Sequence, residues 1–415
     1  MVTLKSPTDR RQNLLILMCW LIYTTAYFGR YSYNSNINLI MADYGVDHAQ
    51  AGLVTTFFFF GYGVGQFING WLCDKYNKHF LFPLVLILSS GLNMALYLQV
   101  PFASVKFLWL ANALLQSCLW SSLISLVSKF LDAEHRQRAI IVLSTTASVG
   151  TFLTYFLSAL FVKLNNFRLS FAFGACVMTV VAVLWLVFFP ALKTLPVQDK
   201  IPDVPGTVDK NGKTHLPRIM VFMVISLGCF AVIHNFIKDG LQTWVPSILK
   251  EVHGLSDSLS IVLSLVLPLL GIFGAVFSVT IQKKIRDLVC LCGAFISLSV
   301  GFLLLIMFEL RNSVVITLIC FGIIVLVMHA INNIVTSIAP IQLRDCFNSG
   351  RMAGTMNACC YIGSTISSYA LGVIADHWGW DSVFVIFLVA ALALVALSGI
   401  YTVCRYLPHK GKQSL

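Results

Sequence analysis

The chain has 415 residues, of which 58% are hydrophobic and only 11% are charged, and its mean hydropathy is +0.84. An average soluble domain has about 25% charged residues. This composition excludes an ordinary soluble enzyme and predicts a protein that crosses a membrane several times.

Twelve apolar segments follow one another along the chain, each long enough to cross a hydrocarbon core of about 30 Å as a helix. The first is too long for the core of a signal peptide, so we expect it to be retained. The predicted fold class is all-α, with twelve transmembrane helices. The segments lie near residues 13–42, 51–72, 79–100, 105–131, 137–164, 168–190, 218–249, 258–281, 287–308, 313–338, 351–375 and 382–404.

The middle of the chain, residues 193–217, is polar and rich in Pro, Gly and charge. It predicts a cytoplasmic linker between two six-helix halves, residues 1–192 and 218–415. Charged positions recur in the two halves, with Arg30 corresponding to Lys238. This weak repeat predicts two pseudo-symmetric halves around a central cleft.

The distribution of basic residues predicts the orientation. Of the 28 Lys and Arg residues, two lie deep within predicted helices, five in or beside loops predicted to face outward, and the other 21 in or beside inward loops and tails. By the positive-inside rule, both termini of this multi-pass protein are cytoplasmic, and we expect it in the cell membrane. The net charge of +11 then reflects topology, so we expect no nucleic-acid partner.

Arg30, Lys238 and Asp239 are the charged residues deep within predicted helices. A charge at the bilayer centre costs about 2.5–3.5 kcal/mol on insertion scales, so each needs a reason to be there. One acid cannot neutralise two cations. Neighbouring helix positions lie about 100° apart, and we expect Asp239 to point away from Lys238. Two cations facing each other across the cleft predict a site for a multivalent anion; the alternative is that Asp239 forms a structural pair with one of them.

Polar side chains follow the same helical faces and are candidates for lining the site. Each taken singly is as readily explained by helix packing, but they converge on corresponding helices. Protonation of either histidine in the set would adjust the charge of the pocket. Besides Arg30 and Lys238, the candidate substrate-binding residues are Tyr27, Tyr62, Gln116, Trp120, His234, His329, Asn333, Asn357 and Tyr361.

The sequence contains no nucleophile–base constellation, and its 12 cysteines lack metal-ligand spacing. We therefore expect no enzymatic activity, no metal and no cofactor. The expected partners are a small anionic substrate and the lipid bilayer, with the protein a monomer. The glycines of GYGVGQ, residues 61–66, are interpreted as close-packing positions of a helix, because no strand precedes them.

Several stretches resemble a known family. GWLCDKYNKH, residues 70–79, looks like the loop signature of the major facilitator superfamily. More narrowly, AYFGRYSYN (26–34), KDGLQTWVPSILKEV (238–252) and ADHWGWDSVF (375–384) resemble the organophosphate:phosphate antiporters. That family exchanges glycerol-3-phosphate or hexose-6-phosphate for inorganic phosphate, and the resemblance spans nearly the whole chain.

The resemblance implies that Arg30 and Lys238 bind phosphate, with lysine replacing the family's second arginine. Lysine acts as a compact point charge, whereas arginine holds phosphate through a planar fork. The aromatic positions match at Tyr27, Tyr62, Trp120 and Tyr361, and His329 replaces a tyrosine of the family's pocket. Three polar residues of the glycerol-3-phosphate carrier are replaced by Gln66, Ala147 and Pro268, so the substrate need not be glycerol-3-phosphate.

The resemblance further implies alternating access, with Asp74 forming a latch near Arg138 or Arg351 at the cytoplasmic side. A bound dianion would neutralise the two cations and permit the crossing, which predicts obligatory exchange of an organic phosphate for inorganic phosphate. Two alternatives stay open. One is proton-coupled symport of carboxylates or sugar acids through Asp239, and the other is a transporter-like sensor of sugar phosphate.

Overall fold

The computed structural model describes residues 7–72, 75–195, 218–343 and 349–406, and within these ranges every regular element is a helix. Eleven of the described helical segments are long and apolar enough to span a membrane. The predicted all-α membrane fold is confirmed. Of the predicted linker, residues 196–217 lie outside the described part of the chain.

The helices form two compact units. The N-terminal unit comprises residues 1–45, 57–203 and 256–268, and the C-terminal unit comprises residues 46–56, 204–255 and 269–415. The first half of the chain forms α1 (Pro7–Ser35), α2 (Ile37–Tyr44), α3 (His48–Leu72), α4 (Lys78–Tyr97), α5 (Phe102–Phe130), α6 (Ala133–Ser144), α7 (Thr146–Lys163) and α8 (Leu169–Leu192). The second half forms α9 (Arg218–His253), α10 (Asp257–Ser264), α11 (Val266–Gln282), α12 (Leu288–Glu309), α13 (Val314–Asn333), the π-helix η1 (Ile334–Ile338), α14 (Ala339–Gln342) and α15 (Ser349–Tyr406).

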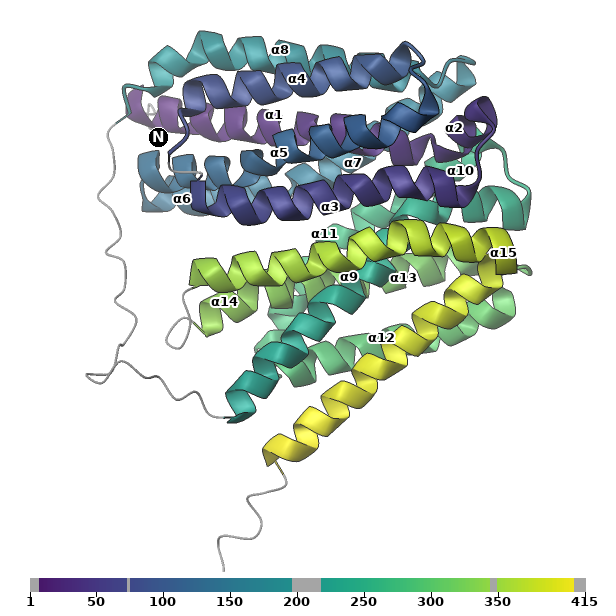
Figure 1. Ribbon diagram of the computed structural model, residues 1–415. Coiled ribbons are helices and arrows are strands. Elements are labelled where there is room, and N and C mark those ends of the chain that lie inside the picture. Colours follow the sequence, from purple (N-terminus) through teal and green to yellow (C-terminus); the bar gives the residue numbers. More distant parts are fainter. Residues whose placement is uncertain (1–6, 73–74, 196–217, 344–348, 407–415) are drawn as a thin grey trace, which may run out of the picture. The chain divides into compact units, whose positions relative to one another are not determined.

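The N-terminal unit packs around α1, which contacts α4, α5, α7 and α8. Figure 1 shows α4 and α8 side by side in this unit. Its core is aliphatic and aromatic, with Phe82, Leu119 and Trp185 fully buried. A central α1 explains why the polar face of this helix, including Arg30, is enclosed by neighbouring helices instead of facing lipid.

Two helical segments belong to the unit formed mainly by the other half of the chain. The first turns of α3 belong to the C-terminal unit, and the rest of α3 to the N-terminal unit. Conversely, α10 belongs to the N-terminal unit, where Ile261 packs with Tyr155 and Ala159 of α7 and Ser258 Oγ donates to the Ala159 carbonyl. In sequence order, α3 and α10–α11 are the second helices of the two predicted halves, and the repeat itself stays a prediction.

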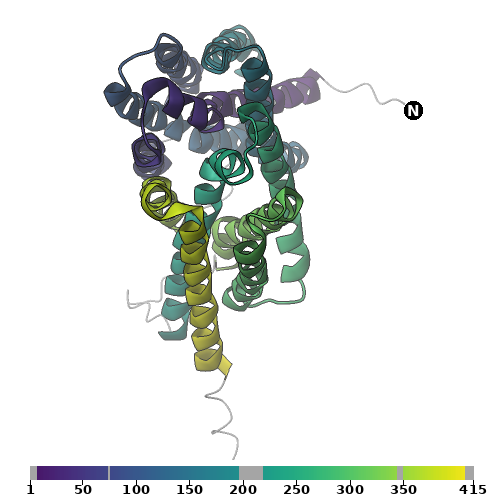
Figure 2. The same ribbon diagram turned by 90° about the vertical axis from the view of Figure 1, so that its right-hand side faces the viewer.

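The last two predicted segments form one long element, α15, interrupted at Gly379. This glycine has φ 76° and ψ 172°, a backbone conformation that residues with a side chain rarely adopt. Figure 1 shows α15 as two straight segments that meet at an angle, and Figure 2 shows the same bend with the second segment in yellow. Counted as two spans, α15 accounts for the difference between eleven and the predicted twelve.

Helix starts coincide with short polar residues whose side chains accept a backbone N–H. Asn77, Ser256, Asp287 and Ser313 cap α4, α10, α12 and α13 in this way. At α6 the cap is Asp132, which accepts from the backbone of His135 and from Gln12 of α1, and these bonds lower the pKa of its carboxyl to about 2. The loops between spans are therefore fixed locally by their own sequence.

The glycines of GYGVGQ are close-packing positions, as predicted. A Cβ on Gly65 would lie 2.2 Å from Ser117 Oγ on α5, and one on Gly61 would lie 2.6 Å from Leu110 Cδ1. Ser117 Oγ donates to the Leu114 carbonyl and accepts from Asn69, so it cannot turn aside without losing hydrogen bonds. The two helices approach as closely as they do because these positions lack side chains.

We expect Gly65→Ala to destabilise the protein by about 1–3 kcal/mol, because the added methyl overpacks the α3–α5 contact. Gly91→Ala on α4 is the matched control, since a Cβ there meets no atom within 4 Å. Thermal unfolding of both variants in detergent measures the difference. Equal midpoints for the two variants would contradict the packing role of Gly65.

Candidate functional site

Arg30 of α1 is 7% exposed and is enclosed by aromatic rings of the N-terminal unit. Its guanidinium carbon lies 4.5 Å from the ring centre of Tyr62, 4.9 Å from that of Tyr27 and 5.1 Å from that of Tyr23. Such cation–π contacts are worth about 0.5–2 kcal/mol each, with the larger values where water is excluded. The tyrosines therefore stabilise a positive charge at a depth where it would otherwise be costly.

A hydrogen-bond chain orients the guanidinium. Arg30 Nε donates to Gln116 Oε1 at 2.6 Å, and Gln116 Nε2 donates to Asn112 Oδ1 at 3.0 Å. Asn112 donates in turn to the carbonyl of Gly29, the residue before Arg30, at 2.7 Å. The chain closes a loop between α1 and α5. This chain of amide groups fixes the orientation of the guanidinium.

Lys238 of α9 belongs to the C-terminal unit, with a side chain that is 12% exposed. Its Nζ lies 3.3 Å from Asp239 Oδ1. The other carboxylate oxygen, Oδ2, accepts from Ser364 Oγ at 2.5 Å and from Asn235 Nδ2 at 3.0 Å. Asp239 thus has one oxygen directed to Lys238 and the other held by α9 and α15.

The expectation that Asp239 points away from Lys238 is wrong for half of the carboxylate. The backbone positions do diverge, but the four-carbon stem of lysine is flexible enough to bring Nζ back to its neighbour. Asn235 and Ser364 donate hydrogen bonds to the Asp239 carboxylate and hold it in place. The sequence alone could not show that these two side chains contact Asp239. Lys238 is therefore a compensated cation in this unit.

The remaining candidates on α9 and α13 lie near one another. His234 Nδ1 lies 2.6 Å from the Phe230 carbonyl, and its Nε2 lies 3.2 Å from Asn332 Oδ1. Asn333 donates to Ser278 of α11 at 2.9 Å. The His234–Asn332 and Asn333–Ser278 contacts join different helices, so both His234 and Asn333 contribute to packing whether or not they contact a substrate.

His329 is accommodated by two glycines of α11. A Cβ on Gly271 would lie 2.8 Å from Nε2 of the His329 ring, and a Cβ on Gly274 would lie 3.0 Å from the Cβ of His329. The buried Nε2 forms no hydrogen bond with the described residues. One turn further along, the π-helix η1 widens the backbone directly after Asn333. Short π-helical turns inside α-helices occur frequently at functional sites.

The other candidates have these positions. Trp120 lies against Tyr23, with ring centres 4.9 Å apart. Asn357 and Tyr361 are half-buried on α15. Asp74 and the side chain of Arg351 lie outside the described part of the chain, and Arg138 pairs with Glu134 one turn away. The proposed latch of these three residues stays a prediction.

Sequence reasoning missed Asn112. Tyr23, Asn332 and Ser364 lie on the helical faces predicted to line the site, but the sequence did not predict their partners. Tyr23 shares a helical face with Tyr27 and Arg30, which is a signal the spacing contained. Asn112, Asn332 and Ser364 come from other helices, and their partners depend on helix rotation. The π-helix leaves no pattern in a single sequence.

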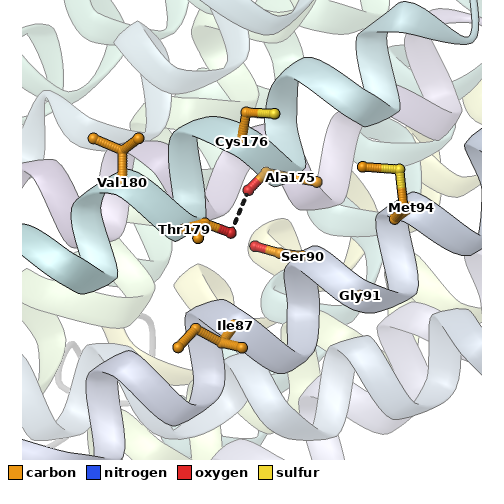
Figure 3. Close-up of a pocket in the computed structure, with 8 residues that line it drawn as sticks. All are labelled: Ile87, Ser90, Gly91, Met94, Ala175, Cys176, Thr179 and Val180. Carbon is orange, nitrogen blue, oxygen red and sulfur yellow. Dashed lines mark hydrogen bonds between the residues drawn. The ribbon is translucent and has the colours of Figure 1, made fainter.

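A separate cavity of about 450 Å³ lies between α4 and α8 (Figure 3). Its lining is apolar or uncharged, and the one hydrogen bond drawn there, from Thr179 Oγ1 to the Ala175 carbonyl at 2.9 Å, is internal to α8. A cavity of this kind has no charge to compensate an anion. It is not a candidate for the anion site.

No group of three or more His, Cys, Asp or Glu side chains in the described residues is placed to hold a metal ion. The ten cysteines of the same part of the chain are free thiols. The buried clusters around Arg30 and Lys238 call for a functional explanation.

Comparison with known proteins decides the family. The family model described as Major Facilitator Superfamily matches residues 19–347. The chain belongs to the major facilitator superfamily. Members of this superfamily are membrane transport proteins rather than enzymes. In structure, the chain is similar to a bacterial homologue of the human lysosomal transporter Spinster, with a TM-score of 0.76 over 96% of this chain and 97% of that one, at 15% identity. Likeness at that identity shows the fold alone.

Two curated relatives narrow the resemblance within the superfamily. The chain is 22% identical to the membrane sensor protein UhpC of Escherichia coli strain K12, over 91% of this chain and 89% of that protein. It is 23% identical to a probable hexose phosphate transport protein of Chlamydia pneumoniae, over 35% of this chain and 32% of that protein. These relatives agree with the resemblance to the organophosphate:phosphate antiporters.

Gln116→Leu should destabilise the protein, because it removes the acceptor of Arg30 Nε and the donor to Asn112. An unsatisfied buried polar group costs about 1–3 kcal/mol, and more if charged. Gln116→Glu keeps an acceptor oxygen and adds a countercharge, so its loss should be smaller. Thermal unfolding in detergent compares the two. A leucine variant as stable as the glutamate variant would argue against the orienting role of Gln116.

Proposed function

We propose that the protein is a secondary transporter that exchanges an organic phosphate for inorganic phosphate by alternating access. The observation that supports it most directly is the guanidinium of Arg30, buried in a cage of tyrosines and held by Gln116. Such a group is a costly feature in a membrane protein, and intramembrane charges mark transport pathways by default. The name of one curated relative, a probable hexose phosphate transport protein, supports the substrate class.

A phosphate ester suits the charges available. It has a charge of about −1.5 to −2 at neutral pH. In the proposal, the guanidinium of Arg30 donates planar, bidentate hydrogen bonds to the anion. The ammonium group of Lys238 acts as a point charge, and it gives up its contact with Asp239 when it binds the anion. The tyrosines around Arg30 keep water away from the guanidinium, which strengthens its attraction for an anion.

The same charges explain obligatory exchange. In the proposed cycle, a carrier with no bound anion crosses slowly between its two conformations. A bound dianion lowers the barrier because it interacts more favourably with the dehydrated intermediate than with the open forms. Each crossing then requires a bound anion, organic or inorganic. The cell membrane and cytoplasmic termini remain part of the proposal, on the basis of the positive-inside rule.

A sensor is the second candidate, and the similarity to a membrane sensor protein over 91% of the chain favours it. A sensor would bind the same ligand without sustained exchange. The deciding experiment is uptake of labelled phosphate into proteoliposomes preloaded with phosphate, glucose-6-phosphate, glycerol-3-phosphate or a dicarboxylate. Rapid uptake that requires a phosphate compound inside supports the exchanger. Binding of glucose-6-phosphate without uptake supports the sensor.

Arg30→Ala should abolish exchange and lower phosphate affinity at least tenfold, since hydrogen bonds to charged groups are worth about 1.5–3 kcal/mol each. Arg30→Lys keeps the charge but loses the planar fork, and should retain part of the affinity. Lys238→Arg should be tolerated or bind phosphate more tightly. Binding measured by isothermal calorimetry, with gel filtration to verify folding, tests all three. Wild-type affinity in Arg30→Ala would refute the assignment.

Asp239→Asn separates exchange from proton symport. For an exchanger, phosphate counterflow should persist between pH 6 and 8, with a loss of stability because Lys238 loses its partner. For a symporter, exchange would persist but accumulation driven by an imposed pH gradient would vanish. Ser364→Ala is the matched control, because it weakens the hydrogen bonding of Asp239 without removing the carboxylate. Accumulation lost only in Asp239→Asn would contradict the exchanger.

A further inference from the structure

Three titratable side chains that are not candidates for the anion site meet in the C-terminal unit. They are His48 at the start of α3, Glu251 near the end of α9 and Asp376 of α15, three residues before the break at Gly379. His48 Nδ1 lies 2.5 Å from Asp376 Oδ1, and Nε2 lies 2.7 Å from Glu251 Oε1. All three helix ends are on the outer side of the membrane in the predicted topology.

This geometry requires a proton on each nitrogen of the imidazole. A carboxylate only accepts hydrogen bonds when ionised, and a neutral imidazole donates from one nitrogen only. The neutral ring would direct its lone pair at one of the two carboxylates. The doubly protonated imidazolium donates one hydrogen bond to each carboxylate. The cluster therefore holds one more proton than it would with a neutral His48 ring.

The carboxylates are fixed by groups other than His48. Asp376 Oδ2 accepts from the backbone of Ala49 at 2.8 Å, and Glu251 Oε2 accepts from Trp380 Nε1 at 2.9 Å. The His48 ring lies 5.4 Å from the rings of both Trp244 and Trp380. These bonds keep both acids aimed at the imidazole.

The other titratable groups nearby are Asp47 on the same segment, Lys250 and His253 on α9, and His377 on α15. In the described part of the chain, only Glu251 and Asp376 form hydrogen bonds or ion pairs with the His48 ring. The Glu251 side chain is 39% exposed and that of His48 16%, so water reaches the cluster. Protons can therefore exchange with the outer solution.

The cluster lies at the end of a close contact between α3 and α15. A Cβ on Gly52 would lie 2.2 Å from the Ser368 carbonyl, and one on Gly372 would lie 2.6 Å from the carbonyl of His48. Thr56 Oγ1 also donates to the Thr365 carbonyl at 2.9 Å. The backbone of the first turns of α3 thus packs directly against the backbone of α15. At the start of α3, the imidazole of His48 adds charged contacts to Asp376 and Glu251.

We propose that His48, Glu251 and Asp376 form a proton-binding site that fastens the start of α3 to α9 and α15 when occupied and loosens it when empty. Because α3 continues from Phe57 in the other unit, proton occupancy controls how firmly this helix is held at its outer end. Raising the outer pH removes the proton and one hydrogen bond. Exchange limited by release of α3 should therefore accelerate as the outer pH rises, a consequence that rests on the proposed function.

The proton site is tested without substrate. Because a protonated imidazole quenches tryptophan fluorescence, emission of the purified protein between pH 5 and 10 should titrate as Trp244 and Trp380 respond to His48. His48→Gln should lose this titration. The His377 ring lies 5.8 Å from that of Trp378, so all variants are made in a Trp378→Phe background. There His377→Gln, on the exposed side of α15, is the matched control and should keep the titration. The same titration in His48→Gln as in the wild type would overturn the proposal.

The carboxylates give a second measurement, which also protects the test against a variant that fails to fold. Glu251→Gln and Asp376→Asn each remove one negative charge, so the titration midpoint should move to lower pH by about one unit. Unchanged midpoints in both folded variants would overturn the site. In proteoliposomes, counterflow of phosphate should depend on outer pH in the wild type and become flat in His48→Gln. The fluorescence titration would persist even if the protein did not exchange phosphate. The proton-binding site and the proposed exchange function can therefore be refuted independently of each other.

Discussion

The cost of burying positive charge in hydrocarbon constrains this protein more than any other interaction. A chain with so few charges retains Arg30 and Lys238 within apolar helices, and each has to be stabilised by its surroundings. The surrounding helices supply rings, amides and one acid in defined positions. A guanidinium is stabilised only by groups within a few ångströms. The rotation of α1 and its close approach to α5 therefore have to bring such groups next to Arg30.

The two units solve this problem differently. Around Arg30 the contacts include tyrosine faces and an amide oxygen, which orient the guanidinium. Around Lys238 the carboxylate of Asp239 lies at 3.3 Å. Breaking a buried ion pair is costly, so an anion that binds Lys238 has to compensate for weakening its contact with Asp239. In the proposed function, Arg30 is therefore the principal anchor and Lys238 the adjustable partner.

Glycines determine where the helices come close enough for these contacts. In lipid there is no hydrophobic driving force between helices, so close packing of small residues replaces it. Gly65 admits Ser117 at the α3–α5 contact, and Gly271 and Gly274 admit the imidazole of His329. The contact of Gly52 and Gly372 brings His48 beside Asp376. Polar chemistry in this protein thus depends on positions that have no side chain at all.

The sequence by itself determined the membrane fold, the number of spans, the anomalous charges and the packing role of Gly61 and Gly65. Each follows from properties local to one segment: hydropathy over about 20 residues, the cost of a charge within it, or the absence of a side chain. Only the tertiary structure decided that Gln116 and Tyr62 hold Arg30, that Asp239 reaches back to Lys238, and that His48 meets two acids from distant helices. Those pairings depend on how helices far apart in the chain are rotated and at what angle they cross. The local properties of a single sequence do not determine either the rotation or the crossing angle.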